Sequence, residues 1–184
     1  MKWIIGGLLS VLVSLPVMAQ PWHKSPALEQ LIVKLNTKYQ SDDLSKYKQE
    51  KMEQVDNLSY FIRYLDQPGT EQHAKLKAFL WGMQAAHIGS INQQIQTNVV
   101  PWFCPAGGSL KTVSHNATNP TEFIENIIWE ALERDLKHDP KAFDEFDGVA
   151  AFSYTTGLIM YGLQTKYPCY DQVPQSHRLV GFNY

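Results

Sequence analysis

The sequence predicts an all-α fold, a compact single domain of about five helices held by one disulfide. Apolar residues recur three and four residues apart along most of the chain, which is the period of a helix with one buried face. Residues typical of helix ends, such as Ser, Asp, Pro and Gly, separate these periodic stretches. The chain holds only two cysteines, Cys104 and Cys169, and no stretch shows the alternation of a β-strand.

The first two predicted helices cover most of residues 26–66. Ser25 and Pro26 start the first one, because Ser is a favoured N-cap and the missing N–H of Pro costs nothing in a first turn. This helix ends near residue 39. The second predicted helix runs over about 44–66 and stops at Pro68-Gly69, a pair that breaks helices.

Thr70 caps a third predicted helix over about 71–95. Gly82 and Gly89 lie inside it. A glycine in a helix interior costs about 1 kcal/mol relative to alanine. We therefore expect a neighbouring helix to pack closely against these two positions.

Helical periodicity stops between residues 97 and 119, where prolines and glycines accumulate. A loop of this length in a compact domain is usually functional or disordered, and Cys104 favours order here. Asn119-Pro120 then opens a fourth helix. Asp139-Pro140 ends it and starts a fifth, which reaches about residue 166, just before Cys169.

Residues 1–19 have the pattern of a cleavable signal peptide. Lys2 provides a positive start, an apolar run follows, and Val17-Met18-Ala19 offers small residues at the positions a signal peptidase reads. The apolar run is shorter than the ~20 residues that span a bilayer. The sequence therefore predicts export to the periplasm, with residues 20–184 as the mature domain.

The charge of the chain argues against two kinds of partner, nucleic acids and membrane surfaces. The formal net charge is −2, and it becomes −3 once Lys2 leaves with the leader. This balance argues against nucleic-acid binding and provides no polybasic patch for a membrane surface. We expect no nucleic acid and, after cleavage of the leader, no membrane association.

Two cysteines in an exported chain are most simply a disulfide, Cys104–Cys169. They cannot form a tetrahedral zinc site alone, and no histidine pair lies at ligand spacing beside them. If they were free, either could act as a nucleophile with a histidine as base. We expect the oxidised pair.

The sequence contains none of the motifs that would predict an enzyme. It has no His-Glu-x-x-His, no glycine-rich phosphate loop and no Gly-x-Ser-x-Gly. We therefore expect no catalytic activity, no metal and no cofactor. One charged feature remains, since residues 120–147 are strongly acidic. They form either a solvated face or a face that attracts a basic partner.

Several motifs recur in the order found in a known family: Phe79-Leu80-x-Gly82, Phe103-Cys104-x-x-Gly107, the apolar stretch 127–132, Ala150 and Tyr167-Pro168-Cys169. In this order the chain resembles the Rap/Tai-type immunity proteins over roughly residues 75–169. It differs in that Pro105 follows the first cysteine directly and residues 112–121 form a longer segment.

The resemblance implies a periplasmic protein that protects a bacterium from a peptidoglycan amidase effector of type VI secretion. It implies a helical homodimer that inserts the loop between its third and fourth helices into the amidase active site. The contact residues that this predicts are Gly107, Gly108, Ser109, Lys111, His115 and Asn116. The alternative is a general periplasmic binding or chaperone module without a dedicated toxin.

Overall fold

The structure is a computed structural model that describes residues 22–97, 99–104, 118–144 and 148–169. These ranges hold six α-helices, two short 3-10 helices and no strand. In chain order they are α1 (Pro26–Tyr39), α2 (Lys46–Met52), α3 (Leu58–Tyr64), α4 (Glu71–Gln96), α5 (Glu122–His138), η2 (Pro140–Phe143), η3 (Val149–Phe152) and α6 (Thr155–Lys166). The predicted all-α class is confirmed. The predicted leader, 1–19, lies outside the described residues.

The expected helix starts are confirmed at α1 and α4. The Ser25 hydroxyl accepts the N–H of Leu28 at 3.3 Å and caps α1. The Thr70 hydroxyl accepts the N–H of His73 at 3.1 Å in the same way. Each side chain satisfies a donor that the first turn of a helix leaves without a partner.

The helix predicted over 44–66 is in fact two helices, because its middle pairs with a distant segment. Asn57 is fully buried, and its side-chain amide donates to the carbonyl of Phe152 at 2.8 Å. The N–H of Leu58 donates to the carbonyl of Ser153 at 2.9 Å. The Asn57 side-chain oxygen then accepts the N–H of Ser59 and caps α3. Tertiary hydrogen bonds thus interrupt a sequence that is locally compatible with one helix.

The prediction of one helix over 140–166 is also wrong for the first half of this range. Two 3-10 helices replace it there, and α6 begins only at Thr155. Gly148 has a φ of +66°, and a Cβ at this position would collide with the side chain of Lys38. The N–H and the hydroxyl of Thr155 both donate to the carbonyl of Asp56, at 2.7 and 2.9 Å. These contacts decide where α6 starts.

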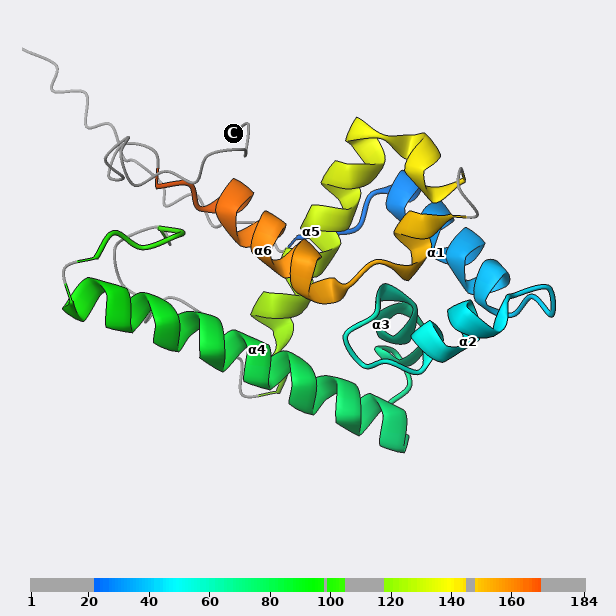
Figure 1. Cartoon of the computed structure of the whole chain (residues 1–184), viewed down its shortest axis with the longest axis horizontal. Coiled ribbons are helices and arrows are strands. Elements are labelled where there is room, and N and C mark those ends of the chain that lie inside the picture. The colour runs from blue at the N-terminus through cyan, green and yellow to red at the C-terminus, as the bar shows by residue number, and fades with distance from the viewer. Residues whose placement is uncertain (1–21, 98, 105–117, 145–147, 170–184) are drawn as a thin grey trace, which may run out of the picture.

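The core lies around α5, which contacts α1, α4 and α6, and whose interface with α6 is the largest (Figure 1). At this interface Gly162 of α6 lies against Ile127. A Cβ at residue 162 would lie 2.7 Å from the Ile127 side chain and 2.8 Å from its carbonyl oxygen. The close approach of the two helices therefore requires glycine here. The buried apolar residues of α5 are Ile124, Ile127, Ile128, Trp129, Ala131 and Leu132.

The long helix α4 runs along one side of the molecule, with the other helices on one side of it (Figure 1). Gly82 and Gly89 are exposed, and a Cβ at either position would meet nothing within 4 Å. Trp81 beside them is also largely exposed. The expected close packing of a neighbouring helix against these glycines is therefore wrong within the described residues.

None of the helices in the described ranges combines the length and the apolar character needed to cross a bilayer.

Candidate functional site

The predicted loop over 97–119 is non-helical in the parts that the structure describes. Two short segments connect it to the helical frame. We call residues 99–104 the N-terminal stem and residues 118–121 the C-terminal stem. Together with the face of α4 beneath them, these stems form the candidate functional site.

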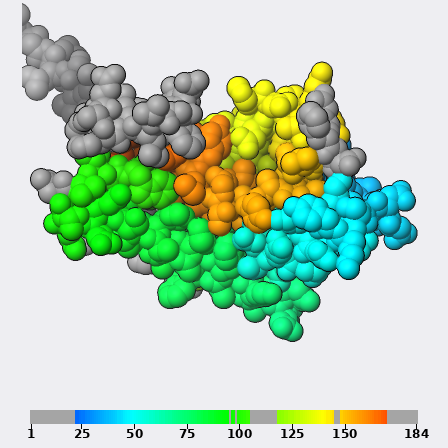
Figure 2. All heavy atoms as spheres, in the orientation of Figure 1, coloured from blue at the N-terminus to red at the C-terminus, as the bar shows by residue number. Residues whose placement is uncertain are grey.

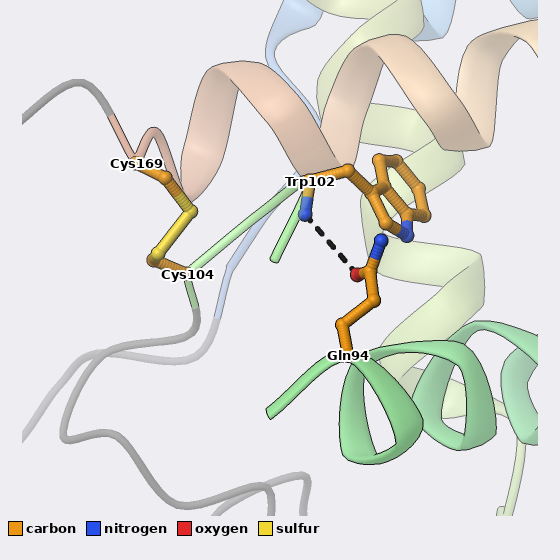
Figure 3. Close-up of a disulfide and its surroundings, with 4 residues drawn as sticks. All are labelled: Gln94, Trp102, Cys104 and Cys169. Atoms are coloured by element: carbon orange, nitrogen blue, oxygen red, sulfur yellow. Dashed lines mark hydrogen bonds between the residues drawn. A yellow bond between two sulfur atoms is a disulfide. The ribbon is translucent and has the colours of Figure 1, made fainter. Parts of the chain in front are cut away.

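The N-terminal stem is held covalently at its last residue (Figure 3). Cys104 forms the predicted disulfide with Cys169, and their Cα atoms lie 5.2 Å apart. The N–H of Cys104 also donates to the carbonyl of Tyr167 at 2.7 Å. The disulfide is confirmed, and because it uses both cysteines of the chain, neither can serve as a thiol nucleophile.

Two aromatic residues fix the rest of this stem. Phe103 is buried, and its ring lies edge-on to that of Trp102 with centroids 4.6 Å apart. The N–H of Trp102 donates to the side-chain oxygen of Gln94 at 3.3 Å, as Figure 3 shows. The Trp102 ring also packs edge-on against the imidazole of His87, with ring centroids 5.2 Å apart. The stem is therefore packed against α4 as well as bonded to the segment after α6.

His87 lies under the N-terminal stem and is half-buried. Burial lowers the pKa of its imidazole, because an apolar environment disfavours the charged form. Its Nε2 atom is buried and has no hydrogen-bond partner among the described residues. The ring therefore acts here as a neutral packing partner of Trp102.

The C-terminal stem is held by a compact polar cluster. Lys77 of α4 forms an ion pair with Glu125 of α5 and donates to the side-chain oxygen of Asn119 at 2.7 Å. The amide of Asn119 donates to the second oxygen of Glu125 at 3.1 Å. The Thr121 hydroxyl lies within hydrogen-bond distance of the side-chain oxygens of Asn119 and Glu125, and its single proton is shared between these two acceptors. Every polar side chain of the cluster has at least one hydrogen-bond partner within it, and fully satisfied buried polar groups of this kind rigidify a structure.

One helix holds both stems. Gln84 of α4 donates to the carbonyl of Pro120 at 3.0 Å, so it holds the C-terminal stem together with Lys77. His87 and Gln94 contact the N-terminal stem. Given 3.6 residues per turn, these four residues lie along one side of α4. The sequence analysis missed Lys77, Gln84 and Glu125, because their partners are distant in the chain and no local motif marks them.

The predicted contact residues Gly107, Gly108, Ser109, Lys111, His115 and Asn116 lie outside the described residues. The structure describes only the two stems on either side of them, residues 99–104 and 118–121.

Several acids of the stretch 120–147 are paired or buried. Glu130 is paired with Lys166, and its side chain is only 16% exposed. Glu133 is 12% exposed and paired with Lys137 one turn later. Glu125 is buried in the stem cluster. These three carboxylates therefore contribute little to the attraction of a basic partner.

Within the described ranges, no group of three or more His, Cys, Asp or Glu side chains is arranged to hold a metal ion.

No protein-family model matches the chain, and no significant match was found among curated proteins or solved structures. The functional assignment therefore depends on the residues themselves.

Proposed function

We propose that the protein is a periplasmic immunity protein that binds a peptidoglycan amidase effector of type VI secretion and inhibits it by occluding its active site. The observation that carries the proposal is the double anchoring of the central loop. A disulfide and two packed aromatic rings hold one stem, and a four-residue polar cluster holds the other.

This anchoring suits an inhibitor for an energetic reason. A loop that becomes ordered only on binding subtracts its lost conformational entropy from the affinity. Fixing both stems to α4 restricts the intervening segment before any partner arrives. The order of motifs shared with the Rap/Tai-type immunity proteins supports the same role for this loop, with Gly107 and Gly108 able to approach another backbone closely.

The compartment follows from the same features. Disulfides persist in oxidising compartments such as the bacterial periplasm, and residues 1–19 have the pattern of an export signal. We further propose, on the resemblance, that the protein acts as a homodimer. Because the sequence contains none of the catalytic motifs, we also propose that it has no catalytic activity of its own. Sedimentation of the purified protein at several concentrations tests the dimer.

The decisive test compares inhibition with stability. A Gly107→Trp/Gly108→Trp variant should no longer inhibit the cognate amidase, because the bulky rings would clash with an active-site groove. A matched control, Ser41→Trp/Asp42→Trp, makes the same change in the exposed turn after α1 and should inhibit fully. The measurements are peptidoglycan hydrolysis by the purified amidase and thermal unfolding of both variants.

Full inhibition by the loop variant would place the inhibitory surface elsewhere. Failure of the native protein to bind the amidase, together with suppression of aggregation of unrelated unfolded proteins, would favour the general chaperone module instead.

A further inference from the structure

A separate cavity of about 330 Å³ lies between α5, α6 and the 3-10 helices. Figure 2 shows the surfaces of α5 and α6 adjoining on one face of the molecule. The volume is at the lower end of the range of small-molecule sites, about 300–1,000 Å³. The lining residues are Leu132, Asp135, Phe143, Ala150, Ser153, Tyr154, Gly157, Leu158 and Tyr161.

The wall is mostly apolar, and two of its four polar side chains, Ser153 and Tyr154, are already engaged in hydrogen bonds. The Ser153 hydroxyl donates to the carbonyl of Ala150 at 2.8 Å. The Tyr154 hydroxyl accepts a hydrogen bond from the ammonium group of Lys51. Asp135, by contrast, makes no hydrogen bond or ion pair through its carboxylate with any described residue.

Asp135 is half-buried, and burial raises the pKa of its carboxyl group. His138 and Arg134 oppose this effect through their charges, but they do not outweigh it. The Arg134 guanidinium instead lies over the ring of Tyr161, 5.8 Å from its centroid. The cavity therefore contains a partly desolvated carboxylate that no cation of the described chain bonds directly.

Gly157 lines the cavity from the first turn of α6. A Cβ there would meet nothing within 4 Å, so packing within the chain does not require glycine. Gly162, five residues later, differs, because a Cβ there would collide with Ile127. Gly157 carries the helix cost of about 1 kcal/mol relative to alanine, and its effect is to leave the cavity open.

We propose that this cavity binds a small organic cation, a protonated amine or amidine carried on a compact apolar body. The cation would lie against Asp135, and the body against Leu132, Leu158 and Tyr161. A charge-assisted hydrogen bond to a carboxylate is among the stronger polar contacts. The proposal is independent of the proposed immunity function, since neither stem of the central loop lines the cavity.

The test uses the purified, disulfide-bonded protein and two probes of equal shape. Benzamidine carries a positive charge, whereas benzamide is neutral. We expect benzamidine to bind at least about tenfold more tightly, because a hydrogen bond to a charged group contributes about 1.5–3 kcal/mol and 1.4 kcal/mol is a factor of ten. Titration followed by NMR chemical shifts measures both affinities and locates the perturbed residues.

Two variants separate charge from shape. Asp135→Asn should remove the preference for benzamidine, whereas the neighbouring Glu133→Gln should keep it, because Glu133 is paired with Lys137. Gly157→Leu should fill the opening and abolish binding of both probes. Its matched control Gly82→Leu changes a glycine of α4 with equally open surroundings and should bind like the native protein.

The proposal is overturned by absence of benzamidine binding at about 10 mM, by equal affinity for the two probes, or by unchanged binding in Asp135→Asn. Thermal unfolding of each variant establishes that it is folded. If Asp135→Asn does not fold, the Gly157→Leu comparison and the two-probe ratio still decide the proposal.

Discussion

The two stems of the central loop are held by different kinds of interaction. A covalent bond and apolar ring contacts hold the N-terminal stem, whereas hydrogen bonds and one ion pair hold the C-terminal stem. Attachment of the N-terminal stem therefore depends on the redox state of the two cysteines. Attachment of the C-terminal stem depends on every member of the polar cluster being present. The contrast shows that one loop can have two points of attachment that fail under different conditions.

The largest effect is expected at the covalent anchor. Replacing Cys104 and Cys169 by serine should lower the free energy of unfolding by about 4 kcal/mol, because the bond restricts a long loop in the unfolded chain. Denaturant unfolding of the native and doubly substituted proteins measures the change. Reductant should destabilise the native protein by the same amount and leave the serine variant unaffected. Labelling of two thiols in denatured, unreduced protein from the periplasm would contradict the disulfide there.

Removing one member of the polar cluster at the C-terminal stem should lower the free energy of unfolding almost as much. Glu125→Ala leaves the Lys77 ammonium without its carboxylate, and breaking a buried ion pair costs about 3–5 kcal/mol. We expect about 3 kcal/mol, at the lower end of that range, because the side chain of Lys77 remains 25% exposed. Chemical denaturation checks this value.

A double variant, Lys77→Met/Glu125→Leu, serves as the control for the polar anchor. It should be more stable than Glu125→Ala, because it leaves no unpaired charge behind. Equal destabilisation by the single and double variants would mean that packing, rather than charge, holds the C-terminal stem.

The helix that carries both stems should tolerate a change on its exposed side. Gly82→Ala should raise the free energy of unfolding by about 0.5–1 kcal/mol, because alanine is the better helix former and its Cβ meets nothing within 4 Å. Thermal unfolding measures the gain. A loss of stability would show that α4 needs this glycine for a contact with another molecule, such as the second subunit of the proposed dimer.

Acid should loosen the N-terminal stem through His87, and we expect this effect to be the smallest. The imidazole has a lowered pKa in the folded protein, so below the ordinary histidine pKa of 6.5 the unfolded chain binds more protons than the folded one. Stability should therefore decrease as the pH falls from 6.5 toward the folded pKa, and remain constant above 6.5. His87→Gln should remove this part of the pH dependence. An identical profile in the variant would contradict the role of His87.

Local sequence signals predicted several elements because the responsible contacts are local. Ser25 and Thr70 cap helices by bonding to N–H groups three residues later, which a reader of the sequence can anticipate. The apolar stripe of α5 follows the helical period and is buried as expected. The disulfide was also predictable, because only two cysteines exist.

The candidate site was predictable only in part. The break in periodicity and Cys104 indicated the loop and one of its anchors. The cluster of Lys77, Asn119 and Glu125 was not predictable, since its members are up to 48 residues apart and each has the local pattern of an ordinary polar residue. The pairing of Glu130 was not predictable for the same reason, because its partner Lys166 lies on another helix.

By itself, the sequence determined the helical class, the starts of the first and third predicted helices, and the single disulfide. Only the tertiary structure decided where the helices predicted over 44–66 and 140–166 break. Residues 56–58 and 152–155 exchange backbone and side-chain hydrogen bonds there, and the bonds outweigh local helix preference at both places. The physical reason is that helix propensity is worth only fractions of a kcal/mol per residue. A buried backbone group without a partner costs more than that, so the pairing between distant segments determines where each helix ends.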